Sequence, residues 1–78
     1  MTYFFHLFST DAPVLDEEGV ECADLAVVAT RAMCCARELM AADVKDGALD
    51  LRQRIDVVDD HGSTIHTLNF EDAVSVAR

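Results

Sequence analysis

Residues 24–47 read DLAVVATRAMCCARELMAADVKDG, and this stretch decides the fold. Its apolar side chains recur at the spacing of one helix face, at Leu25, Val28, Ala29, Ala32, Ala36, Leu39 and Met40. Asp24 stands where a carboxylate can cap the first turn, and Gly47 stands where a helix commonly ends. The stretch therefore predicts one long helix with a single buried stripe.

Extended segments flank this helix on both sides. Before it, residues 3–8 form a short aromatic strand, and residues 14–22 form a second strand that is broken by a bend. After it, residues 54–58 and 64–70 form two strands that an Asp-Asp-His-Gly turn connects. We expect the first strand to pair antiparallel with the third, which leaves the second and fourth strands at the sheet edges.

A short last helix is expected after Asn69, which stands at its cap. Its apolar face consists of Phe70, Ala73, Val74 and Ala77. A helix of this length is not stable alone, so it must dock against the rest of the chain. The order β-β-α-β-β-α predicts an α+β fold, with a small, mostly antiparallel sheet of three to four strands packed against one long helix. Residues 1–78 form a single domain.

The composition is acidic, with 15 Asp and Glu against 6 Lys and Arg and a net charge of −9. Nucleic acids and anionic membranes attract clustered basic side chains, so we expect neither as a partner. No stretch approaches the roughly 18 apolar residues of a membrane span, and the first residues lack the features of a signal peptide. A cytoplasmic protein is expected, since the three cysteines fit no disulfide framework.

The first strand is apolar on both faces, and one long helix covers only one face of a sheet. A bare apolar face would exceed what a monomer usually exposes, so we expect a homodimer in which two such faces meet. The predicted interface residues are Phe4, His6, Phe8, His66, Leu68 and Phe70.

Two histidines are the candidate metal ligands, His6 and His66, which can meet if their strands lie close together. The chain lacks the closely spaced ligand pairs typical of zinc sites, so no metal and no other cofactor is expected. For acid–base chemistry the candidate pair is His6 with Asp56. The chain has no nucleophile elbow, phosphate loop or dinucleotide-binding glycine pattern, which favours a protein without catalytic activity.

Two further features have plain structural interpretations. Cys34 lies on the polar face of the helix with Arg31 and Arg37, which could activate a thiol, although an incidental surface thiol is the simpler interpretation. The acidic residues from Asp16 to Asp24 lack the register of a calcium loop. They are interpreted as a solvated loop that favours the start of the helix.

Several strings along the chain resemble one known family: YFFHL at 3–7, DEEGVE at 16–21, ARELM at 36–40 and VVDDHG at 57–62. They are similar to a family of short, uncharacterised bacterial proteins, domain-of-unknown-function family 6894. Where that family has Leu-Pro-Asp before the helix, this chain has Cys22-Ala23-Asp24. The resemblance covers nearly the whole chain and implies no activity.

The sequence as a whole indicates a small acidic binding or regulatory module without catalytic activity, with a second copy or another protein as its partner. Two alternatives stay open. One is a small-molecule or metal-binding protein that uses the strand histidines. The other is an acidic partner of a basic protein, whose binding would weaken as salt is added.

Overall fold

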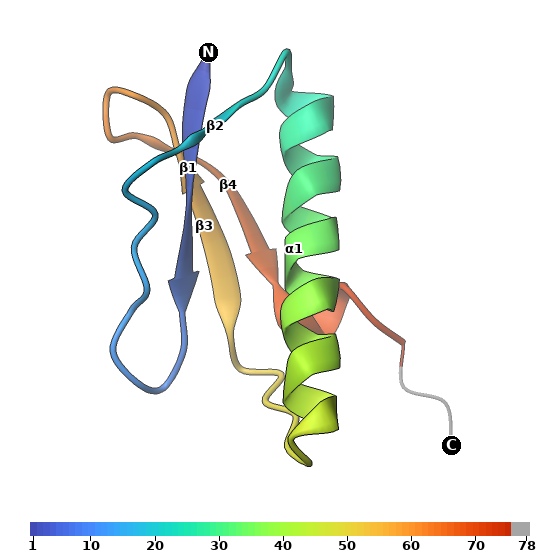
Figure 1. Ribbon diagram of the computed structural model, residues 1–78. Helices are drawn as coiled ribbons and strands as arrows, with labels where there is room; N and C mark the ends of the chain where they lie inside the picture. The colour runs from blue at the N-terminus through green and yellow to red at the C-terminus, as the bar shows by residue number, and fades with distance from the viewer. Residues whose placement is uncertain (76–78) are drawn as a thin grey trace.

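The computed structural model describes residues 1–75, and it consists of one sheet and one long helix (Figure 1). The elements are β1 (Thr2–Phe8), β2 (Val20–Glu21), α1 (Leu25–Lys45), β3 (Arg54–Val58), β4 (Thr64–Asn69) and a 3-10 turn, η1 (Phe70–Asp72). The predicted α+β fold is confirmed. Helix α1 begins and ends where the sequence pattern predicts, with the Asp24 carboxylate accepting a hydrogen bond of 3.0 Å from the Val27 N–H.

The sheet has the strand order β2-β1-β3-β4, and every neighbouring pair is antiparallel. This is the predicted order, with β1 beside β3 and the other two strands at the edges. Phe5 lies opposite Val57, and Leu7 lies opposite Ile55. Because directly opposed residues point to the same side of a sheet, these four side chains share the face that α1 covers.

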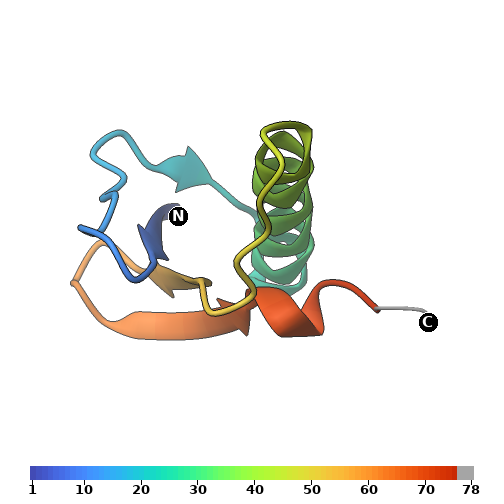
Figure 2. The same ribbon diagram turned by 90° about the horizontal axis from the view of Figure 1, so that it is seen from below.

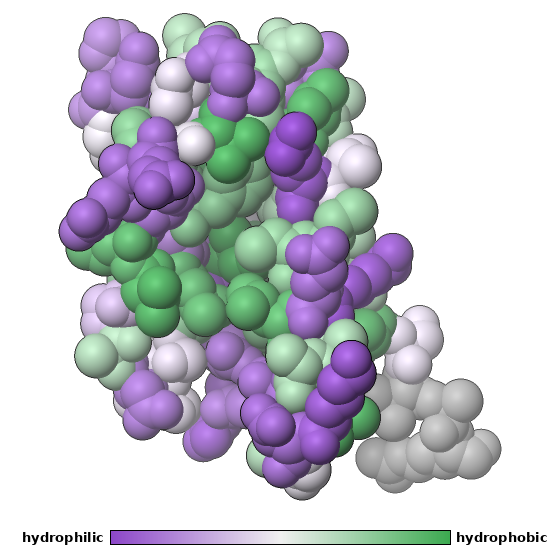
Figure 3. Space-filling view, in the orientation of Figure 1, coloured by the Kyte–Doolittle hydropathy of each residue, from purple (hydrophilic) through white to green (hydrophobic). Residues whose placement is uncertain are grey.

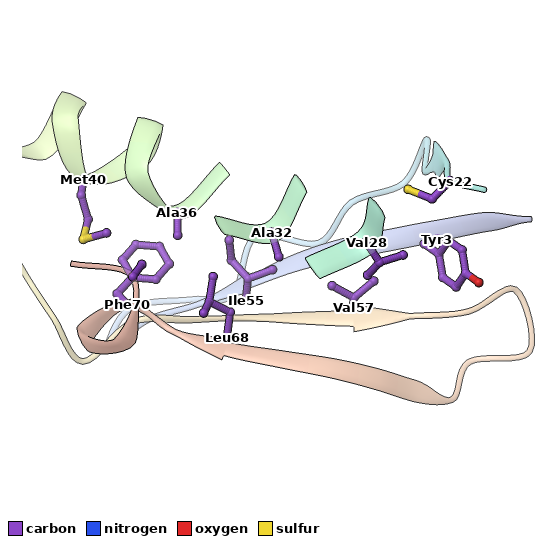
Figure 4. Close-up of a cluster of buried hydrophobic side chains, with 11 residues drawn as sticks. Tyr3, Cys22, Val28, Ala32, Ala36, Met40, Ile55, Val57, Leu68 and Phe70 are labelled. Atoms are coloured by element: carbon purple, nitrogen blue, oxygen red, sulfur yellow. The ribbon is translucent and has the colours of Figure 1, made fainter. Parts of the chain in front are cut away.

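The hydrophobic core lies between α1 and this face of the sheet (Figure 4). Its helical part repeats every four residues, at Val28, Ala32, Ala36 and Met40. The two alanines in the middle of the stripe allow the helix to lie close to the sheet, where Ile55 and Val57 are almost completely buried. Leu25 was expected on the same stripe but is 59% exposed at the first helical residue.

The last helix predicted from the sequence begins after Asn69 as expected, but it is much shorter. Among residues 70–75, the chain forms only the three-residue turn η1, and the Asn69 side chain makes no capping hydrogen bond. Phe70 and Ala73 already reach the core within this one turn, so nothing favours a longer helix that would be unstable alone. The turn is held on α1 by Arg37, whose Nε donates to the Ala73 carbonyl at 2.9 Å. Residue Ala77 of the predicted helix lies outside the described residues.

The predicted apolar face is also corrected. Leu68 and Phe70 are core residues, 9% and 0% exposed, and Figure 4 shows Phe70 beneath Ala36 and Met40 of α1. Leu68 lies opposite Ile55, and His66 lies opposite Val57, so both are on the α1 side of the sheet. The expected interface residues therefore do not share one surface.

The other side of the sheet, which we call the open face, carries Phe4, His6 and Phe8. Figure 2 shows α1 on one side of the sheet only. All three side chains are half-buried within a single chain. The Arg54 guanidinium lies 4.6 Å from the centre of the Phe8 ring, and the rings of Phe4 and His6 stack with centroids 6.5 Å apart. The open face is thus a mixture of aromatic and charged groups rather than a bare apolar surface.

Candidate functional site

A half-open groove of about 510 Å³ lies between α1 and the β1–β2 side of the sheet. It exists because α1 packs over β3 and β4 and leaves the neighbouring part of the sheet uncovered. We call it the lateral groove, and its lining residues are Phe5, Asp16, Val20, Arg31, Cys34, Cys35 and Glu38. Figure 3 shows hydrophobic side chains across the middle of the molecule, between α1 and the loop that follows β1.

The helical wall of the lateral groove is a second stripe of α1, beside the core stripe. Arg31 and Glu38 each lie three or four residues from Cys34 and Cys35, which places the four on one side of the helix. Phe5 of β1 and Val20 of β2 form the opposite wall. A volume of this size falls within the range of roughly 300–1,000 Å³ that is typical of ligand sites.

Asp16 borders the lateral groove at the place where the second strand is interrupted. The chain pairs with β1 at Val14, through two hydrogen bonds of 2.9 Å with Leu7, and again at Val20. Between these points the Phe5 N–H has no strand partner, and the Asp16 carboxylate accepts from it at 3.2 Å. One side chain thus replaces the missing segment of strand.

The same carboxylate also organises the bend. Its other oxygen accepts from the N–H groups of Glu18 and Gly19, both at 3.1 Å. Desolvation raises the pKa of Asp16, but the N–H groups of Gly19, Phe5 and Glu18 outweigh it and, with the nearby His6, hold the pKa below its usual value. Asp16 therefore stabilises the loop as an anion.

His6 lies on the other side of this bend. Its Nδ1 accepts the Asp16 N–H at 3.0 Å, which assigns the ring proton of the neutral imidazole to Nε2. The predicted partner Asp56 does lie directly opposite His6 in the sheet. Its carboxylate, however, accepts from the Thr67 hydroxyl at 2.9 Å and from Arg54 Nε at 3.3 Å. The hydrogen bonds of both residues are therefore structural.

The two candidate metal ligands are not brought together. His6 is on β1 and His66 is on β4, with β3 between them, and they lie on opposite faces of the sheet. Within residues 1–75, no group of three or more His, Cys, Asp or Glu side chains could hold a metal ion.

The two helix cysteines lie at the lateral groove with different exposure. Cys34 is exposed, as its place on the polar face of the helix predicts, and Cys35 is half-buried. Burial raises the pKa of the Cys35 thiol, and the carboxylates of Glu38 and Asp16 raise it further. Cys35 therefore stays a thiol at neutral pH and contributes an apolar side chain to the groove rather than a nucleophile.

The lateral groove was not predicted from the sequence. From the sequence, Phe5 and Val20 are strand residues only, Arg31 is a basic neighbour of the Cys34 thiol, and Asp16 is part of a solvated loop. One available signal is the break in the second strand, since an interrupted edge leaves a backbone donor that some side chain must satisfy. The Asp-Glu-Glu-Gly string at the break is the other signal, because Asp followed by Gly is typical of a tight turn.

Replacing Gly19 with alanine is expected to destabilise the protein by about 2 kcal/mol or more. Gly19 has a φ of +80°, a backbone conformation that residues other than glycine rarely adopt. An added Cβ would lie 2.6 Å from the Thr2 methyl and 3.0 Å from the Phe4 ring. Gly62→Ala is the matched control, since Gly62 has a φ of +83° and no neighbouring atom within 4 Å of the added Cβ. Urea denaturation measures the free energy of unfolding of both variants, and an equal loss of stability in the two would contradict the close packing at Gly19.

Among the described residues, no helix combines the length and the apolar character needed to cross a membrane. The family model described as "Domain of unknown function (DUF6894)" matches residues 2–71, from the start of β1 into η1. No curated protein and no solved structure matches the chain. The match includes every strand and the whole of α1. The chain therefore belongs to the DUF6894 family.

Proposed function

We propose that this protein is a small binding module without catalytic activity, and that its lateral groove takes an apolar segment with basic side chains from a partner protein. The observation that carries the proposal is the groove itself, a half-open hollow of about 510 Å³ in a chain of only 78 residues.

The apolar part of the lateral groove's lining suits apolar side chains. Phe5, Val20 and Cys35 contribute apolar surface and pack only at the margin of the core. Covering such surface is favourable by roughly 25 cal/mol for each Å² that leaves water. A few aliphatic side chains of a partner would fill a hollow of this size.

The rim of the lateral groove favours basic groups on the partner. Asp16 and Glu38 face it with one basic residue, Arg31. The net charge of −9 adds a long-range field that attracts cationic segments and raises their rate of association. The same field opposes nucleic acid and other polyanions.

The polar groups around the groove support binding rather than catalysis. Burial and two carboxylates raise the pKa of the Cys35 thiol, which removes its nucleophilic form at neutral pH. The Asp16 carboxylate is occupied by three backbone N–H groups, and His6 Nδ1 accepts a fourth. These side chains hold the loop in place.

The test is a titration of the protein with two probe peptides of equal length, one alternating leucine with lysine and one alternating leucine with glutamate. We expect only the lysine peptide to bind, with NMR shift changes centred on Phe5, Val20 and Cys35. Its affinity should fall as salt is added, because the rim and the overall field are anionic.

Cys35→Phe tests the same site from the protein side. The larger ring fills the lateral groove and should weaken binding of the lysine peptide at least tenfold. Val44→Phe is the matched control, because Val44 is an exposed residue of the same helix that does not line the groove. Equal binding by both variants, or shift changes centred on the open face, would refute the groove as the binding site.

A further inference from the structure

The two edges of the sheet differ in how well they are protected. The β2 edge is short and interrupted, and it carries four carboxylates, at Asp16, Glu17, Glu18 and Glu21. Strand β4 reads TIHTLN and has no Asp, Glu, Lys, Arg or Pro. Natural proteins usually block an exposed edge with charged residues, prolines or bulges, because an unpaired edge is a template for another strand.

The outer edge of β4 presents backbone groups of known direction. The Phe70 N–H donates to the Gln53 carbonyl at 3.0 Å, on the β3 side. Because the direction alternates along an antiparallel strand, the N–H and C=O groups of Leu68 also point to β3, whereas those of Thr67 and Asn69 point outward. Both outward residues are exposed.

Within residues 1–75, little else shields this edge. A register shift at Val57–Val58 marks a bulge in the first half of β4 and leaves residues 66–69 as regular strand. Figure 2 shows β4 as the outermost strand at the bottom of the view, while α1 lies on one side of the sheet. A second strand can therefore approach residues 66–69 without meeting the helix.

We infer that β4 pairs antiparallel with β4 of a second copy of this chain, about a twofold axis at Leu68. Thr67 of each copy then lies opposite Asn69 of the other, and their outward N–H and C=O groups form the ladder. The two sheets become one continuous sheet with both helices on the same side. This contact is separate from the lateral groove and does not depend on the proposed function.

Two copies can meet at this edge because their pairing there does not bring carboxylates face to face. Each chain carries a net charge of −9, so most contacts between two copies would oppose carboxylates. This pairing places Thr67 opposite Asn69, Leu68 opposite Leu68 and His66 opposite Phe70, so no carboxylate of one copy lies directly opposite a carboxylate of the other along residues 66–70. The acidic and interrupted β2 edge prevents further addition, so the assembly closes at two copies.

Amide hydrogen exchange tests the pairing directly. In a monomer the Thr67 and Asn69 amides face water and exchange rapidly, while the His66 and Leu68 amides are protected by β3. In the paired state we expect the Thr67 and Asn69 amides to become protected as the protein concentration rises, in parallel with a dimer in analytical ultracentrifugation.

Asn69→Pro removes one outward donor from each copy. Asn69 has a φ of −80° and ψ of 138°, which proline adopts readily, and its side chain makes no capping hydrogen bond, so the single chain should fold normally. Loss of two ladder bonds and the added ring should raise the dissociation constant of the dimer at least tenfold. Asn69→Ala keeps the N–H and should dimerise like the original protein.

Two results would overturn the inference. One is a monomer at all concentrations, with Thr67 and Asn69 amides exchanging as freely as in an unstructured peptide. The other is a dimer that Asn69→Pro leaves as tight as Asn69→Ala, which would place the contact on the open face or elsewhere. Thermal unfolding of both variants at low concentration confirms that the single chain is intact.

Discussion

Replacing Phe70 with alanine is expected to lower the free energy of unfolding by about 3 to 5 kcal/mol. The ring is 0% exposed and is among the largest fully buried side chains of the core. A domain of 78 residues has a total stability of about 4 to 12 kcal/mol at typical values per residue. The variant should therefore unfold at a much lower urea concentration, measured by circular dichroism. If the stability of the original protein lies at the low end of this range, the variant is barely folded.

Phe8→Ala is the matched control for this variant. Phe8 is the same residue type on the open face, half-buried and in contact with the Arg54 guanidinium. Its removal should cost about 1 to 2 kcal/mol, since it loses partial burial and one cation–π contact. Similar losses for the two variants would contradict the placement of Phe70 in the core and Phe8 outside it.

The helix follows from the sequence because it depends on a local pattern, and the central place of β1 follows from its apolar composition. The repeat between residues 24 and 47 has only one helical face, and Asp24 stands at the start of that repeat. The aromatic strand at the N-terminus is the most apolar strand, and burial between two neighbours is the natural place for it.

The side of the sheet that each β4 residue faces does not follow from the sequence. Alternation places His66, Leu68 and Phe70 together, but only the register with β3 decides that they face α1. Opposite Ile55, Leu68 has to lie in the core. From the sequence alone these residues are grouped with Phe4 and Phe8, whereas the register with β3 places the two sets on opposite faces of the sheet.

The lateral groove also depends on a placement that periodicity does not contain. The stripe formed by Arg31, Cys34, Cys35 and Glu38 would be ordinary solvent-exposed surface if α1 lay over β1. It lines a groove because the helix packs over β3 and β4 instead. At this offset the small Ala32 and Ala36 side chains share the core with Ile55 and Leu68, and such packing depends on side-chain shape rather than on periodicity.

The second large effect is expected for Asp16→Ala, which should lower the free energy of unfolding by about 2 to 3 kcal/mol at neutral pH. The carboxylate accepts from the N–H groups of Phe5, Glu18 and Gly19, and alanine leaves all three without this acceptor. Glu17→Ala is the matched control, because Glu17 is the next residue along the loop and is exposed. It should change stability by less than about 0.5 kcal/mol.

The pH dependence of this effect has a definite sign. Backbone hydrogen bonds hold the pKa of Asp16 in the folded protein below its usual value of 3.8, so the anion is favoured by folding. Its contribution is present in full above that usual value and is lost as the pH falls through the folded pKa.

Urea denaturation of the original protein and of Asp16→Ala at pH 7 and near pH 2 measures the contribution of the carboxylate to stability at each pH. The difference between them should shrink at the lower pH, because a protonated carboxyl is a weaker acceptor for three N–H groups. A difference that stays constant would mean that the Asp16 side chain stabilises the bend without its charge.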